Sequence, residues 1–203
     1  IDPVFGDAAD QAACRDLILT HFPQAHVFEP EKAGFGAAVK RVWAATTGDL
    51  VFHLEDDWHL NEPLTPDDIL PLMMGDTRSV APVSVEMGWD GSALFNQRQR
   101  KKRVFGLPVG RTVFNVFGTS PRFLDGEFAR ACAALMDPAL DPEKQMRRPG
   151  TPALIAYQQP FRCRLLPGRT RPDLITDIGR GWREARGIEK VVAGGVSTWI
   201  EPK

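Results

Sequence analysis

The sequence predicts an α/β protein that forms a single domain over residues 1–203, with a mostly parallel central sheet flanked by helices. Three observations favour this fold class. Short apolar runs alternate with longer segments of helical periodicity, the connections between them are short, and 203 residues suit one hydrophobic core. Hydrophobic residues make up 43% of the chain and charged residues 25%, which is typical of a globular domain.

The first quarter of the chain carries the clearest element signals. Helices are expected at 7–20, where an aspartate cap precedes a helical apolar pattern, and at 34–47, which Gly48 ends. Short apolar runs at 25–28 and 50–54 are expected to be strands. Strands and helices therefore alternate with short connections, which is the pattern of a parallel sheet covered by helices.

The later elements follow the same reasoning. A threonine cap, a proline and two aspartates predict a helix start at 65–68. Residues 86–111 are expected to be irregular and basic, and the proline-rich segment 138–152 to be a loop around a short helix. The other expected elements are strands near 79–85, 112–117, 161–165 and 196–200, and helices near 121–136 and 178–186.

Charge is divided unevenly along the chain, although the net charge is only −1. Residues 1–90 hold 5 Lys/Arg and 16 Asp/Glu, whereas residues 91–203 hold 20 and 10. The acidic and basic halves either form complementary walls of a cleft for a cation and an anion, or are solvated surfaces.

Cysteine usage and hydropathy bear on the location of the protein. Cys14, Cys132 and Cys163 are scattered without metal-type spacing, which favours a reducing, cytoplasmic location over a disulfide framework. No secretory leader is recognisable. No apolar run approaches the roughly 20 residues that cross a bilayer, so no membrane span is expected.

The most informative stretch is 48–60, where an apolar run ends in three adjacent carboxylates, Glu55, Asp56 and Asp57. In an open α/β sheet, ligands bind outside the carboxyl ends of the strands. Carboxylates at that place suit a hard divalent cation, which prefers oxygen ligands, and the cation in turn suits a substrate that carries phosphates. The alternative is an acidic, solvated turn.

Residues 25–60 resemble the central part of a GT-A glycosyltransferase, particularly the family-2-like inverting enzymes. The motifs that carry the resemblance are Gly34-Phe35-Gly36-Ala37-Ala38, Ala44-Ala45-Thr46-Thr47-Gly48-Asp49 and, in place of the family's D-x-D motif, Leu54-Glu55-Asp56-Asp57. The resemblance implies a GT-A-like (Rossmann-like) domain that moves a sugar from a nucleotide-diphosphate donor to an acceptor, with inversion and with Mn²⁺ or Mg²⁺. It would divide the chain into a donor and metal half, 1–90, and an acceptor half, 91–203.

The resemblance also implies roles for single residues. Asp57 and Glu55 would hold the metal, and the donor-binding residues would be Asp2, Gly34, Lys40, Asp56 and Arg180. Glu143, at a helix start, would be the general base that takes the acceptor's proton, with Asp141 in reserve. The plain alternative for both is an acid at a helix start. The family's first strand is not found, so the chain is expected to lack an N-terminal segment of about 30–40 residues.

Two basic segments complete the sequence-based interpretation. Residues 177–183 combine an aspartate cap with Arg180 and Arg183, which suit bidentate contact with phosphate or simply a capped surface helix. The cation-rich run 97–103 suits a lid over the diphosphate, a patch for an anionic acceptor such as nucleic acid, or a solvated loop. The acceptor is not identified. A nucleotidyltransferase, and a nucleic-acid-binding protein that uses the basic C-terminal half, stay open as other functions.

Overall fold

The computed structural model describes residues 8–82, 94–147, 150–166, 174–194 and 196–200. Its main sheet has four strands, which lie in the order β1 (Leu50–His53), β6 (Arg122–Asp125), β3 (Thr77–Ala81) and β7 (Arg162–Leu165). Of the three described pairings, β1–β6 and β3–β6 are antiparallel and β3–β7 is parallel. The main sheet is mixed, so the prediction of a mostly parallel, Rossmann-like sheet is wrong.

The connection between β3 and β6 explains why the main sheet is mixed rather than mostly parallel. A strand that joins its neighbour in parallel needs a crossover connection, usually a helix. In its place, the described part of this connection holds an antiparallel hairpin, β4 (Gln97–Val104) and β5 (Leu107–Asn115). The chain re-enters the sheet in the reverse direction as β6, and the helix expected at 121–136 divides into β6 and helix α4 (Gly126–Leu135).

Apolar side chains pack on both faces of the main sheet. The helices that contribute to the larger core are α2 (Phe35–Ala44), α4, α5 (Pro142–Met146) and α6 (Pro152–Gln158). Helix α3 (Pro66–Ile69) and the 3₁₀ helix η1 (Leu70–Leu72) contribute to a smaller core. Successive residues of a strand point to opposite faces, so Leu124 of β6 enters the larger core while Phe123 enters the smaller one.

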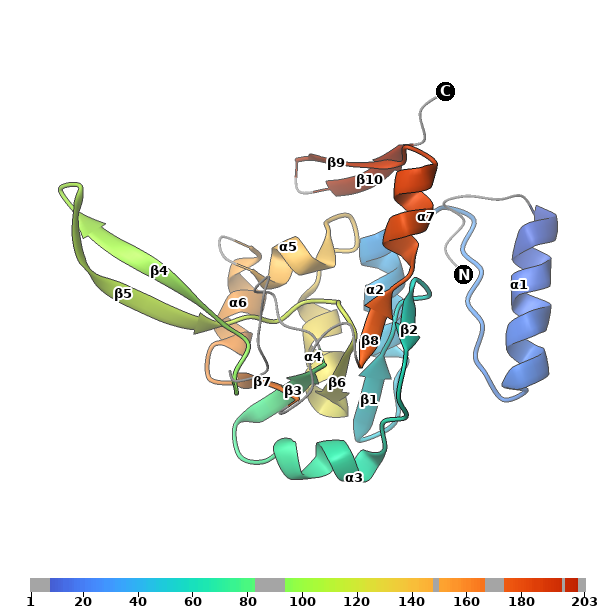
Figure 1. Cartoon of the computed structure of the whole chain (residues 1–203), viewed down its shortest axis with the longest axis horizontal. Helices are drawn as coiled ribbons and strands as arrows, with labels where there is room; N and C mark the ends of the chain where they lie inside the picture. The colour runs from blue at the N-terminus through green and yellow to red at the C-terminus, as the bar shows by residue number, and fades with distance from the viewer. Residues whose placement is uncertain (1–7, 83–93, 148–149, 167–173, 195, 201–203) are drawn as a thin grey trace.

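Further elements surround this body (Figure 1). They are α1 (Ala8–His21), the antiparallel pair β2 (Trp58–Leu60) and β8 (Ile175–Asp177), α7 (Gly179–Ala185), and the hairpin of β9 (Glu189–Ala193) and β10 (Val196–Ile200). The β4–β5 hairpin projects from the body on the side opposite α1 (Figure 1). None of the described helices is long and apolar enough to cross a membrane.

Whether the other sequence-based expectations are confirmed or wrong depends on how local their sequence signals are. The helices expected at 7–20, 34–47 and 178–186 are confirmed within their described residues as α1, α2 and α7. The strand expected at 25–28 is wrong, since that segment has no regular structure. The irregular segment expected at 86–111 is also wrong where it is described, because residues 97–111 belong to the long hairpin. Both errors concern segments whose structure depends on pairing with another part of the chain.

Candidate active site

The three adjacent acids form the turn between β1 and β2. The N–H of Trp58 donates to the carbonyl oxygen of Glu55 at 3.3 Å, which closes the turn. Trp58 then pairs with Asp177 of β8, so the turn leads directly into the β2–β8 ribbon. Asp56 is exposed, whereas Glu55 and Asp57 are half-buried. Two of the three carboxylates therefore have limited contact with solvent.

Asp57 is held by the start of helix α7. Its carbonyl oxygen accepts hydrogen bonds from the N–H groups of Ile178 at 2.9 Å and Gly179 at 3.2 Å. A Cβ on Gly179 would overlap the Asp57 side chain, so the absence of a side chain permits this close approach. Arg183 Nη1 donates to Asp57 Oδ2 at 2.6 Å. No hydrogen-bond donor among the described residues reaches Asp57 Oδ1, which is buried, so this oxygen keeps unused acceptor capacity.

Glu55 lies among other carboxylates in a partly desolvated place. Burial is the largest of the causes that raise the pKa of Glu55 to about 8. The charges of Asp57 and Glu143 raise it further, as does that of Asp56, while a hydrogen bond from the Trp58 side chain opposes the increase. Glu143 belongs to α5, so the candidate base is close enough to Glu55 to interact with it electrostatically. Without a cation, Glu55 is therefore largely protonated at neutral pH, and a bound cation would favour its ionised form.

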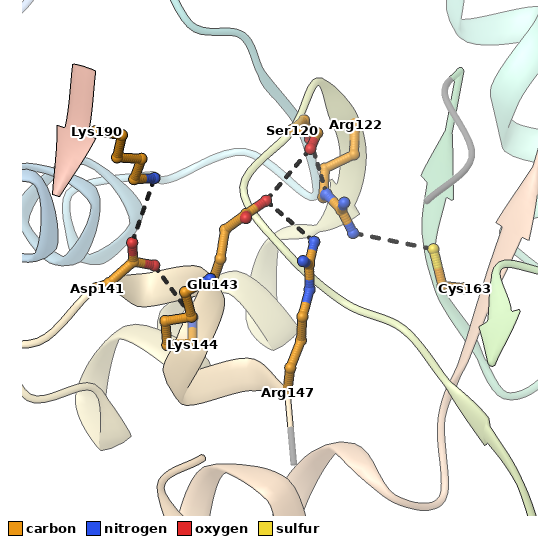
Figure 2. A network of polar contacts seen from close by, with 8 residues as sticks. All are labelled: Ser120, Arg122, Asp141, Glu143, Lys144, Arg147, Cys163 and Lys190. Carbon is orange, nitrogen blue, oxygen red and sulfur yellow. Dashed lines mark hydrogen bonds and ion pairs between the residues drawn. The ribbon is translucent and has the colours of Figure 1, made fainter. Parts of the chain in front are cut away.

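Glu143 is positioned by helix α5 (Figure 2). Asp141 caps this helix, since its Oδ1 accepts from the N–H of Lys144 at 3.1 Å, and a proline occupies the first helical position. Glu143 Oε1 accepts from Arg147 Nη2 at 3.1 Å and from Ser120 Oγ at 3.3 Å. The Asp141 carboxylate is fully buried and engaged by the N–H of Lys144 and by Nζ of Lys190, whereas Glu143 is partly exposed.

Two arginines for which the sequence predicted no role, Arg122 and Arg147, support the position of Glu143. Arg122 is 1% exposed, and its Nε donates to the carbonyl oxygen of Ser120 at 2.9 Å (Figure 2). A Cβ on Gly118 would lie 3.1 Å from Arg147 Nη2 and 3.2 Å from Glu143 Oε1, so glycine leaves room for this pair. Arg122 carries no local signal of this role, because the sequence places it in an expected helix. Arg147 has one, since it follows Glu143 at helical i,i+4 spacing.

The surroundings of Arg147 are rich in positive charge. Burial is the largest cause that lowers the pKa of Arg147, and the charges of Arg122 and Arg98 lower it further. Glu143 acts in the opposite direction by pairing with the guanidinium. The α5 side of the site is therefore a desolvated, cation-rich wall, which suits an anionic group of a ligand.

The remaining sequence-predicted residues lie in varied settings. Asp2 lies outside the described residues. Gly34 is the cap position of α2. Lys40 Nζ donates to the carbonyl oxygen of Met136 at 2.6 Å, so this lysine satisfies the C-terminal end of α4. Arg180 is largely exposed on α7 and lies 3.7 Å from a carboxylate oxygen of the aspartate that ends β8. Asp57 and Glu143 thus both act electrostatically on Glu55, whereas Lys40 is tied to the fold.

The carboxylates alone do not complete a metal site. Within the described residues, no group of three or more His, Cys, Asp or Glu side chains is arranged to hold a metal ion. Magnesium usually takes one or two protein carboxylates, with substrate phosphates and water as its other ligands. Asp57, with its free Oδ1, and the adjacent Glu55 fit that incomplete type of site. No protein-family model, curated protein or solved structure matches this chain.

Proposed function

We propose that this chain is a metal-dependent glycosyltransferase, which moves a sugar from a nucleotide-diphosphate donor to an acceptor hydroxyl with inversion at the sugar carbon. The electrostatic interaction of Glu143 with Glu55 carries the proposal, because it links α5 to the β1–β2 turn. Such a transfer needs a cation for the leaving diphosphate and a base for the acceptor, held close together. The three free cysteines support a cytoplasmic setting for the reaction.

Asp57 and Glu55 are the proposed ligands of Mn²⁺ or Mg²⁺. The buried, unpaired Oδ1 of Asp57 supports this role, as does the crowding of carboxylates around Glu55. When bound, the ion would neutralise the charge that grows on the diphosphate as the sugar–phosphate bond breaks. Asp56, exposed on the same turn, is the proposed contact to the donor.

Glu143 is the proposed base. Its carboxylate would take the proton of the acceptor hydroxyl while the acceptor oxygen bonds to the sugar carbon from the face opposite the diphosphate, which leaves with the electron pair of the broken bond. Arg147 and Ser120 both contact Glu143 Oε1 and hold the carboxylate in one orientation. This leaves Oε2 as the oxygen to receive the proton.

A thermal-shift screen of nucleotide sugars, with and without Mn²⁺, tests the proposal. A donor that binds the folded protein raises the melting temperature, by the equivalent of about 2.7 kcal/mol at a hundredfold excess over Kd. We expect one nucleotide-diphosphate sugar to stabilise the protein with Mn²⁺, to lose this effect with EDTA, and to release nucleoside diphosphate slowly.

Asp57→Asn should lose the Mn²⁺-dependent stabilisation, while Asp67→Asn, an exposed carboxylate on α3, should keep it as the control. If no nucleotide sugar stabilises the protein, the proposal fails. Stabilisation by nucleoside triphosphates with release of pyrophosphate would favour a nucleotidyltransferase instead.

A further inference from the structure

The β4–β5 hairpin is built as an arm that extends from the body (Figure 1). Its two strands pair with each other from Gln97↔Asn115 at the base to Val104↔Leu107 at the tip, and with no other described strand. The base is anchored, since Asn115 Nδ2 donates to the carbonyl oxygen of Phe161 at 2.7 Å. An isolated two-stranded ribbon buries little apolar surface and is marginally stable by itself. Packing in the hydrophobic core therefore does not explain the length of the β4–β5 hairpin.

The tip of this arm is apolar and strained. Phe105 and Gly106 form a two-residue turn in which both have positive φ, at 50° and 80°. Glycine, asparagine and aspartate are the usual residues of such a turn, and a bulky side chain at positive φ is costly. Phe105 is nevertheless present and 100% exposed, and Val104, Leu107 and Val109 beside it are also exposed. The turn therefore presents apolar surface to solvent at a conformational cost.

The shaft behind the tip is strongly basic. Residues 97–115 include six Arg or Lys and no Asp or Glu. The exposed cations with described side chains are Arg98, Lys101, Arg103 and Arg111. Lys101 and Arg111 are direct cross-strand partners, an arrangement that repels unless an anion lies between or over the two charges. Like charges and exposed apolar residues both destabilise the free hairpin, and a single partner would relieve both.

We propose that the β4–β5 hairpin docks the protein on an anionic lipid bilayer surface, with its apolar tip inserted among the headgroups and its cations above them. Interfacial binding elements combine apolar side chains that enter the headgroup–acyl boundary with Lys and Arg that attract anionic lipids. A nucleic acid would match the cations and could stack a base on Phe105, but it offers no apolar surface to the exposed aliphatic side chains of Val104, Leu107 and Val109 beside it. This inference is independent of the proposed glycosyltransferase activity.

Sedimentation with lipid vesicles tests the docking surface. We expect the full chain to bind vesicles of phosphatidylcholine with phosphatidylglycerol more tightly than phosphatidylcholine alone, and less tightly as salt rises. Phe105→Asn should weaken binding roughly tenfold or more, because it removes the aromatic side chain that would be buried in the bilayer. Asparagine tolerates positive φ, so this variant keeps the turn. Phe22→Asn, which changes an exposed phenylalanine beyond α1, should leave binding unchanged.

The contribution of the hairpin's positive charge to vesicle binding is tested in the same assay. Lys101→Gln should weaken vesicle binding roughly fivefold, since each cation near an anionic bilayer contributes about 1 kcal/mol. Lys32→Gln, an exposed lysine outside the hairpin, is the matched control and should have no effect. The proposal is overturned if wild-type protein does not sediment with anionic vesicles, or if Phe105→Asn binds them as tightly as wild type. Binding to DNA that is weakened by Lys101→Gln and is tighter than binding to anionic vesicles at the same salt concentration would likewise reject the bilayer in favour of nucleic acid.

Discussion

Asp57 and Glu143 are each paired with an arginine in the candidate site, yet the two pairs differ in origin. Arg183 Nη1 lies 2.6 Å from Asp57 Oδ2 and is 126 residues away in the chain. Arg147 Nη2 lies 3.1 Å from Glu143 Oε1, and Arg147 follows four residues later as the C-cap of the same short helix. The first pair forms only when α7 docks on the β1–β2 turn, whereas the second is available as soon as α5 forms.

This difference shows that the position of Asp57 depends on contacts between distant parts of the chain, whereas that of Glu143 is largely local. Asp57 is fixed by main-chain hydrogen bonds from Ile178 and Gly179 as well as by Arg183, so the acidic turn and the C-terminal region are coupled. Glu143 relies on local helix geometry, supplemented by Ser120. Substitutions on the two sides should therefore differ in how far their effects reach.

The largest effect is expected from Asp57→Asn. Asparagine keeps the shape of the side chain but removes the charge that would bind a divalent ion. Turnover should fall by roughly 10³-fold or more, because metal ions contribute several kcal/mol of charge stabilisation to reactions of this type. Titration calorimetry of donor with and without Mn²⁺ should show that the metal-dependent part of donor affinity is lost. Unchanged donor affinity in a folded variant would exclude Asp57 as a metal ligand.

A large but separable effect is expected from Glu143→Gln. Transfer should fall roughly 10²- to 10⁴-fold, the usual contribution of general-base catalysis, while donor affinity stays near the wild-type value. Steady-state kinetics and calorimetry on one preparation measure both quantities. Lys144→Gln, an exposed neighbour on the same helix, is the control and should retain activity. If Glu143→Gln turns over within a few-fold of wild type, the base lies elsewhere.

The parts of the site that the sequence predicts are those with local signals. An apolar run followed by acids predicts the position of Glu55, Asp56 and Asp57 after a strand. An aspartate followed by proline and glutamate predicts the start of α5, with Glu143 in its first turn. In both cases a few consecutive residues determine the backbone, so no knowledge of distant contacts is needed.

The parts that the sequence does not predict depend on distant contacts. Residues 122–125 continue the apolar spacing of a helix, yet they form β6 because that segment fits between β1 and β3. This tertiary preference also buries Arg122 beside the candidate base. The pairing of Asp57 with Arg183 and the bond from Lys40 to the end of α4 have no counterpart in local spacing.

A smaller effect, on stability, distinguishes Glu55 from its neighbours. The folded-state pKa of Glu55 is about 8, above the ordinary value of 4.5, so the folded protein binds more protons than the unfolded chain between these values. Stability should therefore fall as pH rises through this window, by on the order of 1–2 kcal/mol between pH 6.5 and 8. Urea denaturation across this range measures the slope without added metal.

Two comparisons isolate the contribution of Glu55. His53, whose pKa burial lowers to about 4, affects stability in the opposite direction, but only below its ordinary value of 6.5. Between pH 6.5 and 8, Glu55→Gln should therefore flatten the slope, whereas Glu184→Gln, an exposed acid on α7, should not. A wild-type slope that survives in Glu55→Gln would show that another group is responsible. Mn²⁺ should also flatten the wild-type slope, because a bound cation favours the ionised carboxylate.

The smallest effect is expected at Asp141, and it tests whether α5 is as self-sufficient as the comparison with Asp57 implies. Asp141 Oδ1 caps the helix, while Oδ2 lies 3.5 Å from Nζ of Lys190 in β9. Asparagine caps helices about as well as aspartate, so Asp141→Asn removes the ion pair and keeps the cap. We expect it to cost less than about 1 kcal/mol, since Lys190 is partly exposed, whereas Asp141→Ala should cost about 1 kcal/mol more. Urea denaturation measures both, and turnover reports whether Glu143 has moved. If Asp141→Asn is as damaging as Asp141→Ala in stability and in turnover, the C-terminal hairpin positions Glu143 as well, and both carboxylates depend on the same distant region of the chain.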